Sequence, residues 1–176
     1  MIVIGASMAA VVLGGAERLR WTIAEIPYLD VPSSSHVVAT AMSKNGAVTG
    51  RSGSTLSSVG WHAFVWTPTE GMQQCADDGW ALSLGQAIND AHTVAGSVNT
   101  CPSDNGPCST APAILQLDDE AQLIGPLLQE YAYVQGITEA GHIVYEQSTG
   151  ELWESGGWVN MPDGDSIALP MPDEAW

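Results

Sequence analysis

Ala41–Gly50 (AMSKNGAVTG), Ala87–Gly96 (AINDAHTVAG) and Gly136–Tyr145 (GITEAGHIVY) are three copies of one ten-residue phrase. Each copy contains a small residue, an aliphatic residue, a small polar residue, a charged residue, a turn pair and then a β-branched residue. The copies lie ~46 and ~49 residues apart, and a period of about 40–50 residues is typical of propeller blades and other β-repeats. The phrase therefore predicts a repeated β-unit.

Each copy is predicted to form a β-hairpin. Asn45-Gly46 is typical of a two-residue type I′ turn, which needs positive φ at both positions. Ala140-Gly141 meets this need in part, and in Ala91-His92 the histidine adopts the left-handed region more readily than most residues other than glycine. Residues on both sides of the turns alternate with a period of two, which indicates half-buried strands.

A second pair of strands is predicted after each hairpin, beginning at His62–Trp66 (HAFVW), Ala113–Leu117 (AILQL) and Glu151–Trp153 (ELW). Each unit then has about four short strands, and Trp21–Asp30 is the expected first strand of the first unit. The predicted fold class is all-β, with three four-stranded antiparallel units in a propeller-like arrangement. Closed propellers typically have four to eight blades, so we expect an incomplete or open array.

Two motifs resemble a known family. HAFVW followed by Gly71-Met72, together with AINDAHTVAG, is similar to the HAF repeat of predicted bacterial extracellular proteins. The resemblance covers Trp21–Pro162 and is degenerate in the third unit, where the HAF triplet is absent. It implies an exported, propeller-like β-repeat protein without an assigned activity, and it brings no catalytic residues.

Three segments are expected from this pattern. Met1–Arg20 is an apolar N-terminal segment, residues 21–166 form the β-repeat domain, and Ile167–Trp176 is an extended C-terminal tail. Such arms often lie along a neighbouring subunit.

The N-terminal segment leaves several interpretations open. Met1–Ala16 is apolar and uncharged, as in the hydrophobic region of a signal peptide. It lacks a basic start and is slightly short for a spanning helix. Arg18 and Arg20 would place an anchored domain on the cytoplasmic side. The remaining alternative is a helix or strand packed within the fold.

Three cysteines bear on the compartment. Cys101 and Cys108 bracket the polar loop CPSDNGPC, and we expect a disulfide there, as in exported proteins. Two thiols in a loop are the alternative, and zinc is disfavoured because a second ligand pair is missing. Cys75 has no evident mate and is predicted to be a buried thiol. The expected location is extracytoplasmic, either periplasmic or extracellular, with a membrane anchor as a further option.

The chain is strongly acidic, with 20 Asp and Glu against 4 Lys and Arg and a formal net charge of −16. This charge disfavours binding to nucleic acid and to anionic membrane surfaces. It suits a soluble exported protein or one that meets a basic partner through electrostatic steering.

The seven tryptophans divide into two groups. Trp66 and Trp153 occupy matching repeat positions and are predicted to be core anchors. Trp80, Trp158 and Trp176 are the candidates for an interaction surface, since tryptophan is enriched in binding hot spots.

No catalytic, metal or cofactor site is predicted. The Ser-rich stretch Arg51–Ser58 lacks nucleophile-elbow spacing, and Asp163-Gly164-Asp165 lacks the spacing of a full calcium loop. The four histidines are scattered through the chain: His36, His62, His92 and His142.

Two functions remain as hypotheses. The first is a non-enzymatic protein-interaction module, an accessory or scaffold subunit of an envelope or membrane-associated complex. Its partner would be another protein or a second copy, with Met1–Ala16 or Ile167–Trp176 buried against that chain or a membrane. The alternative is a propeller-like hydrolase or lyase that uses a carboxylate pair, and a concave pocket holding two carboxylates and a histidine would favour it.

Overall fold

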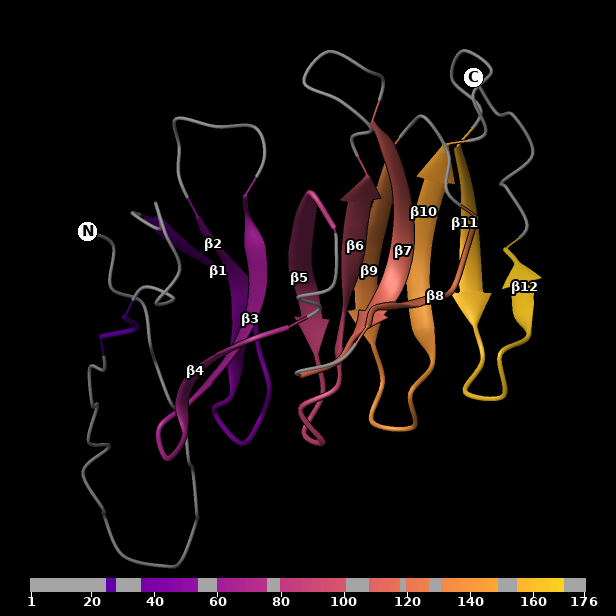
Figure 1. The fold of residues 1–176 in the computed structure, drawn as a ribbon. Coiled ribbons are helices and arrows are strands. Elements are labelled where there is room, and N and C mark those ends of the chain that lie inside the picture. The colour runs from indigo at the N-terminus through magenta and orange to yellow at the C-terminus, as the bar shows by residue number, and fades with distance from the viewer. Residues whose placement is uncertain are drawn as a thin grey trace, which may run out of the picture.

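The computed structural model confirms the predicted fold class. Its described part is all-β, without a helix, and contains three four-stranded antiparallel sheets that do not close into a barrel (Figure 1). The structure describes residues 25–27, 36–53, 60–75, 80–100, 108–117, 120–126, 131–148 and 155–169.

Each sheet is a meander in which neighbouring strands follow each other along the chain. The first sheet contains β1 (His36–Met42), β2 (Val48–Gly53), β3 (His62–Thr67) and β4 (Gly71–Gln74). The second contains β5 (Leu82–Ile88), β6 (Val94–Thr100), β7 (Ser109–Leu115) and β8 (Gln122–Leu123). The third contains β9 (Ala132–Ile137), β10 (Ile143–Ser148), β11 (Ser155–Asn160) and β12 (Ser166–Ala168).

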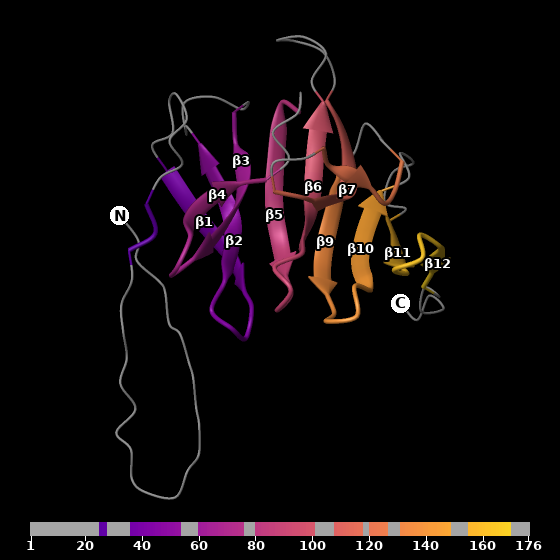
Figure 2. The same ribbon diagram turned by 60° about the horizontal axis from the view of Figure 1, so that its bottom comes forward.

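The sheets stand face to face in a row, with the second between the other two (Figures 1 and 2). Side chains from the facing sides form two apolar cores, which join neighbouring sheets into one array. The core between the first and second sheets includes Ala63, Val65, Val94 and Val98. The core between the second and third includes Ala87, Ala95, Val134, Ile143 and Tyr145.

A third apolar cluster lies on the side of the first sheet that faces away from the second. Val48, Phe64 and Trp66 are buried there, and Ile26 from the segment before β1 packs against them. Trp66 is 9% exposed, which confirms its predicted place in the core. The middle of the outer side of the first sheet is therefore buried, whereas Met42 beside Val48 in the edge strand β1 is 47% exposed.

All three predicted hairpins are present, each linking the first two strands of its sheet, but the turns are longer by one residue than the type I′ prediction. In the first turn the N–H of Gly46 donates to the Ser43 oxygen at 3.1 Å, and the N–H of Ser43 donates to the Ala47 oxygen at 2.9 Å. This is a three-residue turn, Lys44–Gly46, whose last residue has positive φ. Turn positions are counted from the flanking residue, so that Ser43 is the first residue, Lys44 the second and Gly46 the fourth. That position is Gly46 (φ 88°), His92 (φ 62°) and Gly141 (φ 86°) in the three sheets.

Several strand boundaries differ from the prediction: β7 begins at Ser109 rather than Ala113, β11 begins at Ser155 rather than Glu151, and both ends of the array differ as well. The first strand of the first sheet is His36–Met42 rather than Trp21–Asp30, of which residues 25–27 are described and form no strand. The repeat phrase itself supplies the end of this strand. At the other end, Ile167 and Ala168 were expected in the tail and instead belong to β12, the edge strand of the third sheet.

Several predictions fall on residues outside the described part of the chain: Met1–Ala16, Cys101, Trp153 and Trp176. Within the described residues, no helix has the length and apolarity needed to span a membrane.

Candidate interaction site

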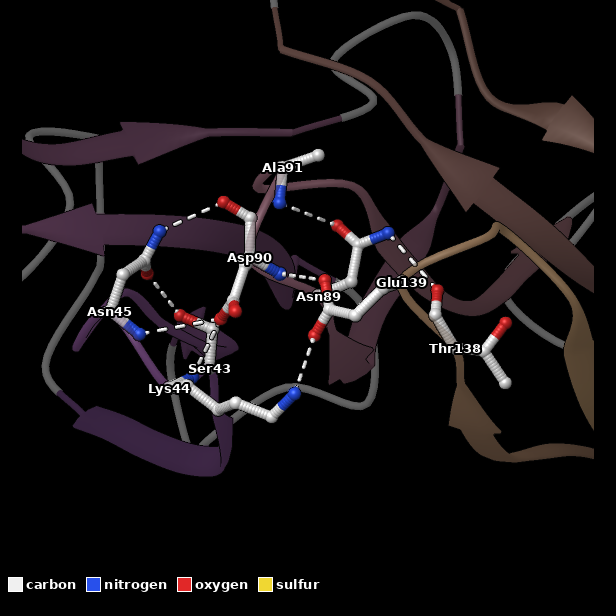
Figure 3. A network of polar contacts seen from close by, with 8 residues as sticks. All are labelled: Ser43, Lys44, Asn45, Asn89, Asp90, Ala91, Thr138 and Glu139. Carbon is white, nitrogen blue, oxygen red and sulfur yellow. Dashed lines mark hydrogen bonds and ion pairs between the residues drawn. The ribbon is translucent and has the colours of Figure 1, made fainter.

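The three phrase turns lie at one edge of the array and are bonded to one another (Figure 3). At the first junction, Asp90 Oδ1 accepts hydrogen bonds from the backbone N–H groups of Lys44 at 2.8 Å and Asn45 at 3.3 Å. The Asn45 side chain returns a bond, with Nδ2 donating to the backbone oxygen of Asp90 at 2.8 Å. The turn of the second sheet thus holds the turn of the first through a carboxylate.

The same contact recurs at the second junction. Glu139 Oε2 accepts a hydrogen bond from the backbone N–H of Asp90 at 2.9 Å. Lys44, Asp90 and Glu139 are the second residues of their turns, so each carboxylate binds the backbone N–H of the equivalent residue one sheet earlier. Lys44 Nζ also lies 3.5 Å from Glu139 Oε1, which links the first turn to the third.

The side chain of the first residue of each turn accepts a hydrogen bond from a backbone N–H at the end of the same turn. The Ser43 hydroxyl accepts from the N–H of Ala47 at 3.1 Å, and the Thr138 hydroxyl accepts from the N–H of His142 at 3.0 Å. Asn89 Oδ1 accepts from the N–H of Thr93 at 2.9 Å. This explains the small polar residue of the repeated phrase, because such side chains stabilise turns by bonding to nearby backbone groups.

A β-bulge gives each junction a second polar contact. The strand registers skip one residue in β1, β5 and β9, and these bulged residues are Thr40, Gln86 and Gln135. Thr40 Oγ1 donates to the Gly85 oxygen at 2.5 Å, and Gln86 Oε1 accepts from the Val134 N–H at 2.8 Å. Gln135 is exposed. The bulge therefore directs a polar side chain towards the next sheet, as bulges commonly re-aim side chains.

The outer side of the third sheet has no sheet against it among the described residues. Strand pairing places Val144 next to Val159 and Val159 next to Ile167 on this side. Tyr133 is 55% exposed and Ile167 is 56% exposed, whereas Val134, Ile143 and Tyr145 on the opposite side are buried. We call this side the open face, and it consists of Tyr133, Val144, Glu146, Val159, Ile167 and Leu169.

Two of the three tryptophans predicted to form an interaction surface, Trp80 and Trp158, lie at the junctions between sheets. Trp80 is partly buried against the core between the first and second sheets, and Trp158 against the core between the second and third. Trp176 lies outside the described residues. Their proposed role in partner binding stays a prediction. The open face has no signal of its own in the sequence, because its exposure depends on which side of the third sheet is covered by the second.

The cysteine predictions have two outcomes. Cys75 is a fully buried thiol next to β4, as predicted, and its backbone forms an isolated antiparallel bridge with Leu117, which lies just after β7. Cys101 lies outside the described residues, so its disulfide with Cys108 stays a prediction.

Two carboxylates and a histidine do come together at the turn edge, although the sequence did not single out this set. Asp90 and Glu139 are joined as described above, and His92 Nε2 lies 3.2 Å from Asn45 Nδ2. These contacts are exposed, and both carboxylates bind backbone N–H groups. Within the described residues, no group of three or more His, Cys, Asp or Glu side chains could hold a metal ion.

Asp163 and Asp165, whose spacing falls short of a full calcium loop, lie in the turn between β11 and β12. Asp163 Oδ1 accepts a hydrogen bond from the N–H of Asp165 at 3.3 Å, and Gly164 between them has φ 96°. The two aspartates thus belong to a turn of the same three-residue type as the phrase turns.

Comparison of the chain with protein-family models, with curated proteins and with solved structures gave no match.

Proposed function

We propose that this protein is a non-enzymatic protein-interaction module that serves as an accessory or scaffold subunit of an envelope or membrane-associated complex. The observation that carries this proposal is the open face of the third sheet. It presents apolar and tyrosine side chains from all four strands, whereas the central strands at the other end of the array have Val48, Phe64 and Trp66 buried.

The composition of the open face supports binding to protein. Contiguous exposed apolar patches commonly mark interaction sites in soluble proteins, and tyrosine is enriched at protein interfaces. Leu169 and Ile167 are 41% and 56% exposed, and Tyr131, which precedes Tyr133 on the same side of β9, is 78% exposed. The acidic chain as a whole would further favour a partner with basic groups around its apolar contact.

The turn edge favours a structural role for the carboxylates over the hydrolase or lyase alternative. Asp90 and Glu139 use oxygens to bind backbone N–H groups of the neighbouring turn. A general acid or base must instead reach a substrate proton. We therefore retain the interaction function.

The extracytoplasmic location is part of the proposal. It is supported by the apolar Met1–Ala16 segment and by the cysteine pair that brackets the CPSDNGPC loop. An exported protein would encounter its partner in the cell envelope or outside the cell.

Site-specific photo-cross-linking in the native host tests the function. A photo-reactive amino acid at Tyr133 or Ile167 should give defined cross-links to another protein. The matched control is Glu70, which is exposed in the β3–β4 turn of the first sheet, far along the array from the open face. Equal yields from all three positions, or none from Tyr133 and Ile167, would contradict the proposal.

A further inference from the structure

The two junctions in the array follow a common rule for docking one sheet on another. At each junction, the receiving sheet is the one that comes earlier in the chain and the incoming sheet is the one that comes later. The incoming sheet supplies a carboxylate at the second turn position, and the receiving sheet supplies the backbone N–H of its own second turn residue. Asp90 meets Lys44 in this way, and Glu139 meets Asp90. The receiving sheet also extends its bulged side chain to the backbone of the first incoming strand.

The third sheet has every receiving feature of this rule. Its second turn residue is Glu139, whose backbone N–H has no hydrogen-bond partner among the described residues. Its bulged residue, Gln135, is exposed in the position from which Gln86 binds the Val134 N–H. Val144 on its open face is equivalent to Thr49 and Ala95, which face the next sheet in the first and second sheets.

The first sheet lacks the features of an incoming sheet. Its second turn residue is Lys44, whose ammonium group has no acceptor for a backbone N–H. On its outer side, its own Val48, Phe64 and Trp66 are already buried, and Ile26 from the segment before β1 packs against them. A second copy of this chain therefore cannot extend the array by placing its first sheet on the open face under the same rule.

Each of the three sheets in the described part of the chain is built from one continuous stretch of sequence. The three units span His36–Gln74, Leu82–Leu123 and Ala132–Ala168. Within the 176 residues, the longest run outside the described part is residues 1–24, which is shorter than any of these units. All three described sheets already belong to the array, and a unit that would fit the open face is not among them.

We propose that the open face is the docking site for a four-stranded sheet of the same repeat type on a partner protein, with Asp or Glu at the second position of its first turn. This inference rests on the proposed interaction function and names the class of partner. The partner's carboxylate would bind the N–H of Glu139, and its first strand would meet the Gln135 side chain. Its apolar side would cover Tyr133, Val144, Val159 and Ile167.

An extended chain tests the docking rule directly. A duplicate of residues 131–169 is joined to Trp176 of the full chain, so that the connection is similar in length to those between the existing sheets. Hydrogen exchange is then followed at the backbone amide of Glu139 in the original third sheet. Docking should slow this exchange by at least about tenfold relative to the parent chain, because the amide gains a charge-assisted bond in a packed junction.

The matched control carries Glu139→Lys in the appended copy alone, which reproduces the residue that the first sheet has at this position. It should lose most of the added protection at the original Glu139 amide. Parent-like exchange in the extended chain would overturn the proposal, as would full protection in the lysine control.

Two further results separate this proposal from the proposed function. Cross-links from Tyr133 together with parent-like exchange in the extended chain would leave the interaction function standing and reject a repeat sheet as the occupant. Sedimentation could instead show that the parent chain dimerises and that Tyr133→Arg abolishes the dimer. That result would identify a second copy as the occupant of the open face, and it would also reject a repeat sheet of a partner protein as the occupant. Protection that depends on the appended Glu139, without cross-links in the host, would support the docking rule and count against the proposed function.

Discussion

Replacing Gly85 by alanine should weaken the junction between the first and second sheets. A Cβ atom at this position in β5 would lie 2.2 Å from Thr49 Oγ1 and 3.0 Å from the Gly50 oxygen of the first sheet. Thr49 is fully buried, and its hydroxyl donates to the Phe64 oxygen at 2.7 Å. The threonine therefore cannot rotate away without breaking this buried hydrogen bond of its hydroxyl, so we expect the sheets to separate instead.

The expected loss follows from the usual cost of overpacking, about 1–3 kcal/mol of unfolding free energy. For a chain of this size, that corresponds to a fall in Tm of roughly 2–12 °C. Urea unfolding followed by tryptophan fluorescence, and thermal unfolding followed by circular dichroism, measure the two quantities.

Gly136→Ala provides the matched control. Gly136 also lies in the first strand of a sheet, but a Cβ atom there would have nothing within 4 Å. Its stability should stay equal to the parent or rise by up to ~1 kcal/mol, since alanine restricts the unfolded chain. The packing argument would be refuted if the unfolding free energy of Gly85→Ala lay within ~0.5 kcal/mol of the parent value. It would also be refuted if Gly136→Ala lost as much stability as Gly85→Ala.

The protein itself suggests a compensating change. At the next junction, Ala95 occupies the position of Thr49 and Val134 occupies the position of Gly85, and both are buried in the shared core. Combining Thr49→Ala with Gly85→Ala should therefore cost less than the sum of the two single changes, with a coupling of about 1 kcal/mol. Strict additivity would show that Thr49 is not the group that the new methyl meets.

Three further predictions concern the turns and the cysteines. Asp90→Ala should lower the free energy of unfolding in urea by about 0.5–1.5 kcal/mol, since it removes exposed hydrogen bonds to two backbone N–H groups. Asp90→Asn keeps an acceptor oxygen and is the control, with a smaller expected loss. No loss in either variant would contradict the role of the carboxylate. Gly141→Ala should lower the free energy of unfolding by about 1 kcal/mol, because φ is 86° at this position. His92→Gly, at φ 62°, should leave the stability unchanged or raise it. A lower Tm for His92→Gly than for Gly141→Ala would exclude backbone strain as the cause. Mass spectrometry of the unreduced protein should show a disulfide between Cys101 and Cys108. It should show Cys75 alkylated only after unfolding, because the Cys75 thiol is buried. Two alkylatable thiols in the loop peptide would count against the exported location.

The local features were the most predictable from sequence. The positions of the hairpins follow from residues that tolerate or require positive φ, and Gly46, His92 and Gly141 indeed adopt it. The turn type was wrong by one residue because Asn45-Gly46 suits both a two-residue turn and the end of a three-residue turn. The turn has three residues because Ser43 pairs with Ala47, and the Asn45-Gly46 dipeptide alone does not specify that pairing.

The ends of the array were harder to predict. β12 contains three residues and pairs only with β11, so its sequence carries little strand signal of its own. Likewise, Trp158 is an aromatic residue in a strand, and its direction depends on the register with Tyr145. A shift of one residue would have placed it on the open face.

The sequence by itself determined the number of units, the place of their hairpins and the all-β class, because these depend on short-range backbone preferences repeated along the chain. Only the tertiary structure decided that Asp90 binds the N–H of Lys44 and that Glu139 binds the N–H of Asp90. It also decided that one side of the third sheet remains open. Both outcomes depend on how whole sheets stack, and stacking brings together residues almost fifty positions apart that no local pattern connects.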